Sequence, residues 1–224
     1  MNPTLTDILL KHKATYYPII SIKKTESILP LNLSITNTEI TESIVASTEL
    51  FSTYILKTLL AGNATFGIGG YKEHRNLYKK SKAFMGSQPR TIHLGVDIWG
   101  AVGTLVFAPI GGMVHSYAFN QTDGDYGVTI ILQHNLDTTA FYTLYGHLSL
   151  KDLEHLRVGK FITRGEVIGH FGNTTENGNW PPHLHFQIIE DIEQYEGDYP
   201  GVCAIEEVAK YVKNCPDAGL MINV

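Results

Sequence analysis

The chain has 224 residues, of which 43% are hydrophobic and 17% charged, and its net charge at pH 7 is −5. This composition excludes a disordered or fibrous protein, and the length suffices for one full core with an extension or for two small domains. The excess of 22 acidic over 17 basic residues argues against nucleic acid or a membrane as a partner, because both are bound by neutralising phosphate charge.

The N-terminal residues 1–13 lack a basic segment followed by a long apolar run, so they do not resemble a signal peptide. No stretch approaches the roughly 18 consecutive apolar residues that a membrane span requires. Cys203 and Cys215 form no Cys-x-x-Cys motif and are expected to be reduced thiols, with a bridge between them as the alternative. These features predict a cytoplasmic protein.

Residues 1–62 are predicted to be mostly helical. Apolar residues three and four positions apart indicate a short helix at residues 7–13 and a longer one from about residue 38 to residue 60, which Gly62 ends. The segment between them contains two prolines and reads as a linker. We therefore expect a helical extension, residues 1–62, that packs on a second unit, residues 63–224.

From residue 91 the pattern changes to short segments rich in β-branched and aromatic residues, separated by glycine and asparagine turns. Such regularly spaced strands predict a mainly β protein with flanking helices and a sandwich or barrel-like core. A last helix is expected at about residues 205–213. The expected strands cover residues 102–109, 112–117, 128–134, 140–145 and 183–189, with two short hairpin-like pieces within 158–169.

Residues 183–189 carry the pattern on which the functional prediction depends. Apolar residues alternate there with His183, His185 and Gln187, which is the period of a strand with one apolar face. Both imidazoles therefore leave the same face of the strand. Such a pair can supply two metal ligands, or one ligand beside one acid/base group.

Two upstream segments contribute further candidate ligands. His93 and Asp97 are four residues apart on a strand-like segment, where they would share one face, and His147 ends a predicted strand. Imidazole and carboxylate form a mixed ligand set suited to Zn²⁺. A hydrolytic zinc site needs three protein ligands and one open position, so His183 and His185 raise the candidates to five and leave two for acid/base work.

The three segments His93-Leu94-Gly95-Val96-Asp97, Tyr145-Gly146-His147-Leu148-Ser149 and His183-Leu184-His185-Phe186 resemble, in order and spacing, the signatures of the lysostaphin/LytM-type zinc metallopeptidases. The resemblance covers roughly residues 91–190 and implies a twisted antiparallel β core, sometimes called a duplicated hybrid motif. Further segments similar to the family are residues 109–114, 126–134 and 165–172.

By position in these motifs, the resemblance implies that His93, Asp97 and His185 are the ligands of one zinc ion and that His147 and His183 are the catalytic pair. It also implies hydrolysis of a peptide or related amide bond. The expected partner is a peptide or amide substrate, peptidoglycan-derived peptides being one candidate. A metal-binding recognition module without turnover, linked to cytoplasmic amino-compound metabolism, is the alternative interpretation.

The chain departs from the family pattern at two positions. Gln187 stands where the family usually has a glutamate, and Asn135 replaces the usual glycine after His134. Neither change removes an expected ligand. A closer resemblance, carried by residues 69–78, 179–189, 197–202 and 215–217, is to the peptidase-like domain fused to class III aminotransferases in some bacteria, and it implies that Gln187 is a feature of that branch.

The segment at residues 67–78 allows two interpretations. Its glycines do not form the Gly-x-Gly-x-x-Gly pattern of a phosphate-binding loop. It is either a loop leading into a helical turn, or a segment whose Tyr71, Glu73 and Arg75 brace or line the site.

Three further side chains near the motifs could have either a structural or a functional role. Trp180 is more typical of loop packing than of substrate contact, Tyr126 could line a cleft, and His134 is expected to be structural or to support a ligand from outside the coordination sphere.

Overall fold

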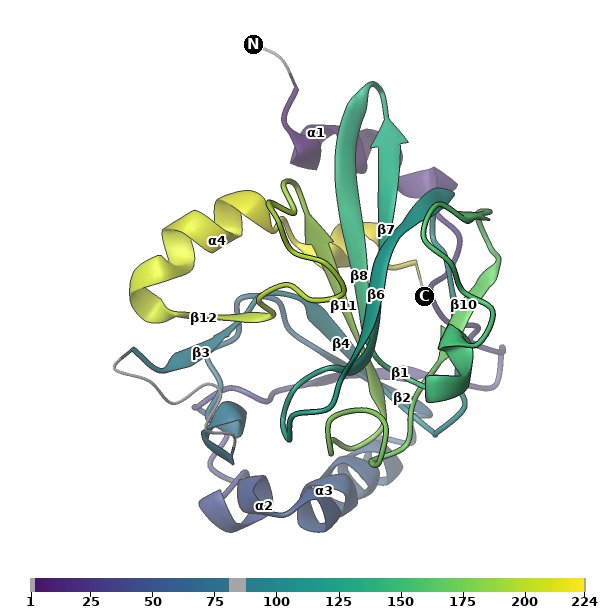
Figure 1. The fold of residues 1–224 in the computed structure, drawn as a ribbon. Coiled ribbons are helices and arrows are strands. Elements are labelled where there is room, and N and C mark those ends of the chain that lie inside the picture. The colour runs from purple at the N-terminus through teal and green to yellow at the C-terminus, as the bar shows by residue number, and fades with distance from the viewer. Residues whose placement is uncertain (1–2, 81–87, 224) are drawn as a thin grey trace.

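The computed structural model describes residues 3–80 and 88–223 and shows a mainly β protein in which helices flank one large sheet (Figure 1). The strands of this sheet, in spatial order, are β1 (Ile28–Leu31), β2 (Phe66–Gly69), β4 (Val96–Trp99), β11 (His183–Ile189), β8 (Thr139–Leu148), β7 (Gly127–Leu136), β6 (Gly112–Asn120) and β9 (Phe161–Ile162). The mainly β prediction is confirmed.

Two details of the predicted core need correction. The large sheet is mixed, because β1 and β2 pair in parallel, whereas its other neighbouring strands pair antiparallel. Within the described residues the sheet ends at β1 and β9, so it does not close into a barrel. Two small antiparallel sheets accompany it: β5 (Leu105–Phe107) with β10 (Val167–His170), and β3 (Arg90–His93) with β12 (Val202–Ala204).

The N-terminal helices form where local capping allows them. Thr4 and Asp7 make a reciprocal capping box at the start of α1 (Leu5–Lys11). The predicted long helix is instead two helices, α2 (Glu42–Ala46) and α3 (Thr48–Ala61). The break occurs at Ser47, whose backbone is extended and whose side chain accepts a hydrogen bond from the Leu50 N–H to cap α3.

Residues 1–62 also contribute a strand that the sequence pattern did not predict. β1 lies in the segment interpreted as a linker and extends the large sheet beside β2. Behind this end of the sheet, a second apolar cluster joins α3 to the strands; it includes Leu31, Phe51, Ile55, Leu59, Trp99 and Trp180. The division of the chain at residue 62 stays a prediction.

The C-terminal helix α4 (Val208–Asn214) follows a short 3₁₀ turn at Ile205–Glu207, close to the predicted range. Cys203 and Cys215 are both buried free thiols. None of the helices in the described ranges is both long enough and apolar enough to cross a bilayer. The cytoplasmic location stays a prediction.

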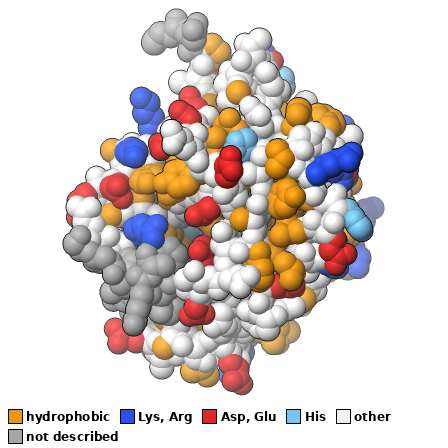
Figure 2. Space-filling view, viewed as in Figure 1, with side chains coloured by type: hydrophobic (Ala, Val, Ile, Leu, Met, Phe, Trp, Pro, Cys, Tyr) orange, Lys and Arg blue, Asp and Glu red, His pale blue; other side chains and the backbone are white. Residues whose placement is uncertain are grey.

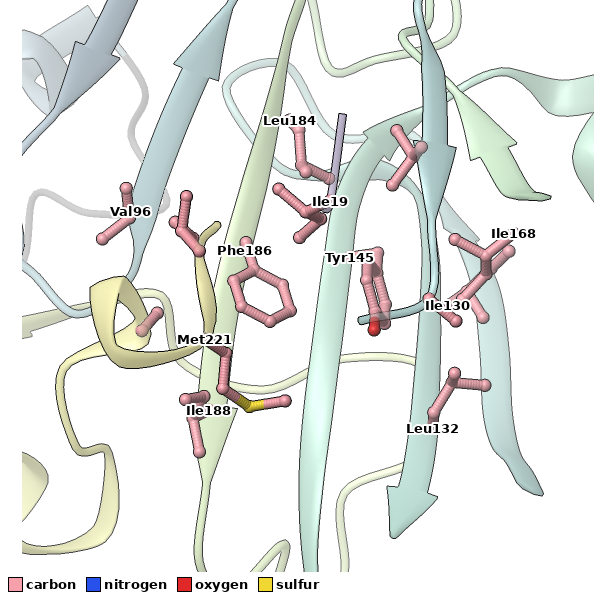
Figure 3. Packing of buried hydrophobic residues seen from close by; sticks show 14 of the residues in the cluster. Ile19, Val96, Ile130, Leu132, Tyr145, Ile168, Leu184, Phe186, Ile188 and Met221 are labelled. Atoms are coloured by element: carbon pink, nitrogen blue, oxygen red, sulfur yellow. The ribbon is translucent and has the colours of Figure 1, made fainter. Parts of the chain in front are cut away.

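Strand β11 is buried on both faces and separates the main core from the site. Leu184, Phe186 and Ile188 pack on one side with residues of β4, β7 and β8 (Figure 3). Full burial of such side chains stabilises the fold by about 1.5–3 kcal/mol each. His183 and His185 therefore lie on the opposite face, held by a strand that the core fixes in place.

Candidate metal centre

The strand register brings the histidines of β11 beside Asp97. His185 is directly opposite Asp97 of β4 in the antiparallel ladder, and His183 is opposite Trp99. His93 does not share a strand with Asp97, contrary to the sequence interpretation: it ends β3, and a turn connects it to β4. Gly95 forms this turn, and a Cβ atom there would lie only 2.6 Å from Cε1 of His185, so this close approach requires glycine.

Three side chains converge on one point within the protein. His93 Nε2 and His185 Nδ1 each lie 3.1 Å from Asp97 Oδ1, and the two nitrogens are 3.0 Å apart. All three residues are at most 3% exposed. Ligands of tetrahedral zinc, with bonds of about 2.0–2.1 Å, are separated by about 3.3 Å, which is close to this spacing.

The other ring nitrogens determine which tautomers are present. His93 Nδ1 faces the Gly70 carbonyl at 3.0 Å, so it must carry the proton and donate. His185 Nε2 donates in the same way to Gln187 Oε1 at 2.9 Å, and the orientation of that amide is fixed because Gln187 Nε2 donates to the Pro200 carbonyl. Two imidazole lone pairs and a carboxylate oxygen therefore face one another with no proton among them, which is the donor set of a cation site.

The charges of this group agree with metal ligation. Burial lowers the pKa of His93 to about 4, so its imidazole is neutral at pH 7. Burial alone would raise the pKa of Asp97, but His93 and the Arg75 guanidinium hold it well below its usual range, and the carboxylate is ionised. Neutral imidazole and ionised carboxylate are the forms that bind metal.

His147 and His183 lie beside this group without belonging to it. Their ring centroids are 4.1 Å apart, and the His147 ring is 6.4 Å from that of His185. His147 Nδ1 donates to the Asn177 carbonyl and His183 Nδ1 to the Pro181 carbonyl, both at 2.8 Å. Each Nε2 therefore carries a lone pair, and neither makes a hydrogen bond to a described residue.

Burial lowers the pKa of His147 well below its usual value and that of His183 to about 4, so both rings are neutral at pH 7. His147 also has a left-handed backbone, with φ of 63°, which is uncommon for a residue other than glycine. Strained backbone of this kind is concentrated at functional sites.

Aromatic side chains fix the orientation of this pair. The Trp99 indole stacks on the His183 imidazole at a centroid distance of 3.9 Å and an interplanar angle of 14°. Trp180 lies edge-on to both His147 and His183, at 6.4 and 6.5 Å. The Tyr126 hydroxyl is 3.4 Å from His185 Nε2. Tyr126 and Trp180 thus both line the site, although Trp180 also packs in the cluster behind it.

All five candidate residues line one cavity of about 200 Å³, together with Arg75, Tyr126 and Trp180. Figure 2 shows Lys and Arg side chains interspersed with Asp and Glu on the face of the protein that it presents. Sequence reasoning missed the contact of Gln187 with His185. The alternation of residues 183–189 held the signal for it, because Gln187 leaves the strand on the same face as both histidines.

Comparisons with known proteins agree with the family resemblance. Residues 91–196 match Peptidase family M23. A segment of 97 residues, 43% of this chain, is 29% identical to the peptidoglycan DD-endopeptidase ShyC of Vibrio cholerae. That segment spans 20% of the length of ShyC.

Among solved structures, the catalytic domain of the antimicrobial peptidase lysostaphin from Staphylococcus simulans is similar at 26% identity, with a TM-score of 0.38, covering 54% of this chain and 80% of that one. A zinc-containing peptidase from Vibrio cholerae is also 26% identical, with a TM-score of 0.36, covering 44% of this chain and 27% of that one.

Proposed function

Because residues 91–196 form a peptidase family M23 domain of the lysostaphin/LytM type, we propose that the protein is a zinc-dependent hydrolase that cleaves a peptide or related amide bond. His93, Asp97 and His185 would hold one zinc ion per chain. The observation that carries this proposal is the convergence of three buried electron-pair donors with no proton among them. A bound zinc ion supplies a Lewis acid that polarises a carbonyl and lowers the pKa of water to about 7.

His147 and His183 would perform the proton transfers. Each ring holds its own proton on Nδ1 through a backbone carbonyl, so Nε2 is the atom that accepts a proton. Their low pKa values keep both nitrogens available as bases at pH 7. A proton accepted at Nε2 can then be donated to the departing amine, so that the pair serves as base and acid in turn.

The class of bond is proposed from both the family and the relative. The V. cholerae relative is a peptidoglycan DD-endopeptidase, which makes peptidoglycan-derived peptides the first candidate substrates. The cavity is small, and aromatic side chains line part of it. This shape supports a short peptide segment, rather than the surface of a polymer, as the part of the substrate that contacts the site.

The test uses the purified protein and a His147→Gln variant. We expect about one zinc per chain in both proteins, and new amine termini when the wild type is incubated with muropeptides or small amides. Because His147 is off the metal, the variant should keep its zinc and lose about 10²–10⁴-fold in rate. Wild-type turnover in the variant would refute the assigned role, and binding without any cleavage by the wild type would favour the recognition module.

A further inference from the structure

A segment outside the family match runs along the metal centre. Residues 70–75 lie beside β3 and exchange backbone hydrogen bonds with it: the Lys72 N–H donates to the His93 carbonyl, and the His93 N–H to the Glu73 carbonyl, at 2.9 and 3.0 Å. The Gly70 carbonyl of this segment also accepts the Nδ1 proton of His93. This part of the chain therefore already fixes one of the three candidate ligands.

The same segment holds a second ligand through Arg75. The Arg75 side chain is buried, and its Nη1 donates to Asp97 Oδ2 at 2.5 Å. This is the carboxylate oxygen that does not face the imidazoles, since Oδ1 is the atom 3.1 Å from both His93 and His185. The guanidinium thus fixes the rotation of the carboxylate and leaves Oδ1 to the metal.

Arg75 is in turn held by residues that lead to the N-terminal part of the chain. Its Nε donates to Glu73 Oε2 at 2.6 Å, and Glu73 Oε1 accepts a hydrogen bond from the Leu33 N–H at 3.0 Å. Leu33 follows β1 and is buried in the apolar cluster beneath α3. A continuous set of contacts therefore connects the N-terminal region to Asp97.

The strand on the other side leaves space for the guanidinium. Gly69 of β2 is directly opposite Asp97 in the ladder, and a Cβ atom there would lie 2.8 Å from Arg75 Nη2. A methyl group at this position would clash with the guanidinium, so the glycine at position 69 leaves room for the Arg75 side chain beside Asp97.

We propose that Arg75 is a positioning residue of the metal centre, which holds Asp97 Oδ2 so that the carboxylate binds zinc through Oδ1 alone, and that Glu73 positions Arg75. This inference rests on the proposed zinc site. Partners of this kind orient ligands, and their loss typically weakens metal binding by about 10–100-fold. A buried arginine with two carboxylate partners is also costly to disrupt, since removing one member leaves a buried charge unpaired.

The experiment compares Arg75→Met, Arg75→Lys and Glu73→Gln with the wild type in the full chain. Zinc affinity is measured by competition with a chelator, and the coordination of Co²⁺ in place of zinc by its visible absorption. We expect Arg75→Met to bind zinc about 10–100-fold more weakly and to give a weaker Co²⁺ band, because a released carboxylate can bind through both oxygens and raise the coordination number.

The two other variants separate charge from geometry. Arg75→Lys keeps the positive charge but lacks the planar guanidinium group, so its zinc affinity should lie between those of Arg75→Met and the wild type. Glu73→Gln retains Arg75 and should weaken zinc binding several-fold. The matched control is His170→Gln, which removes the hydrogen bond between His170 Nδ1 and Asp152 Oδ1, 2.7 Å apart and outside the cavity, and should leave zinc affinity unchanged.

Each outcome is decisive. If the wild type binds no zinc, the proposed function fails. If the wild type binds zinc and Arg75→Met binds it with the same affinity and Co²⁺ spectrum, the positioning role is wrong while the proposed function stands. If Arg75→Met does not fold, Glu73→Gln decides, and wild-type affinity in that variant would overturn the inference.

Discussion

Two histidines of the large sheet, His134 in β7 and His185 in β11, are almost equally buried and differ in what their nitrogens meet. His134 Nδ1 donates to the Gly111 carbonyl at 2.9 Å, and its Nε2 lies within hydrogen-bond distance of the Thr143 hydroxyl, at 2.7 Å. His185 has one nitrogen paired with Gln187, whereas the other faces only acceptors.

This comparison shows that burial alone does not separate a structural histidine from one at the candidate site. Burial lowers the pKa of His134 to about 4, as it does for His93 and His183. The distinguishing property is a ring nitrogen that has no donor to pair with in a buried place. His134 satisfies both nitrogens inside the fold and is structural by this criterion, as the sequence interpretation expected.

The largest predicted effect is loss of metal on substitution of His185. His185→Asn removes one of three converging electron-pair donors, so zinc affinity should fall by at least roughly 100-fold, more than the loss of a partner outside the coordination sphere would cause. Zinc content after dialysis and chelator competition measure this. The matched variant His134→Gln should keep its zinc, and a His185→Asn protein that also kept wild-type affinity would contradict the assignment.

The second prediction concerns the pH dependence of stability. The pKa of His134 is about 4 in the folded protein and about 6.5 when unfolded, so below pH 6.5 the unfolded chain binds the additional proton. The contribution of His134 to the free energy of unfolding is therefore complete above pH 6.5 and is lost as pH falls towards 4. The total loss is on the order of 3 kcal/mol.

Urea unfolding of metal-free protein between pH 7.5 and 5 checks this expectation. His134→Gln should be less stable than the wild type at pH 7.5, because a buried partner is left unpaired. The difference between the two proteins should shrink as pH is lowered, since the variant lacks the titrating group. A difference that is constant with pH would show that His134 is not the group responsible.

The smallest predicted effect concerns Gln187, whose side chain accepts a hydrogen bond from His185 Nε2. Gln187→Glu places a carboxylate where an amide oxygen now accepts from Nε2, which raises the basicity of the imidazole as a ligand. Zinc affinity should rise by up to about 10-fold. Stability should fall by about 1 kcal/mol, because the Pro200 carbonyl loses its donor. Unchanged affinity in chelator competition would show that this partner does not tune the ligand.

Local sequence determined much of the fold and part of the site. Alternation along residues 183–189 predicted that His183 and His185 leave one face of a strand, because side-chain direction in a strand depends only on backbone period. Most expected strands from residue 105 onward are present at similar positions for the same reason. The helix break at Ser47 was missed because apolar periodicity continues across it, and only the cap geometry separates α2 from α3.

Tertiary structure alone decided how the segments meet. Pairing of β11 with β4 sets His185 opposite Asp97, and a turn between two different strands brings His93 to them, which no local period encodes. The same holds for Arg75, which sequence analysis left between two interpretations and which the fold places on Asp97 Oδ2. Sequence thus supplied the candidate side chains. Long-range strand pairing decided which of their nitrogen and oxygen atoms lie together in the buried site, with no proton between them.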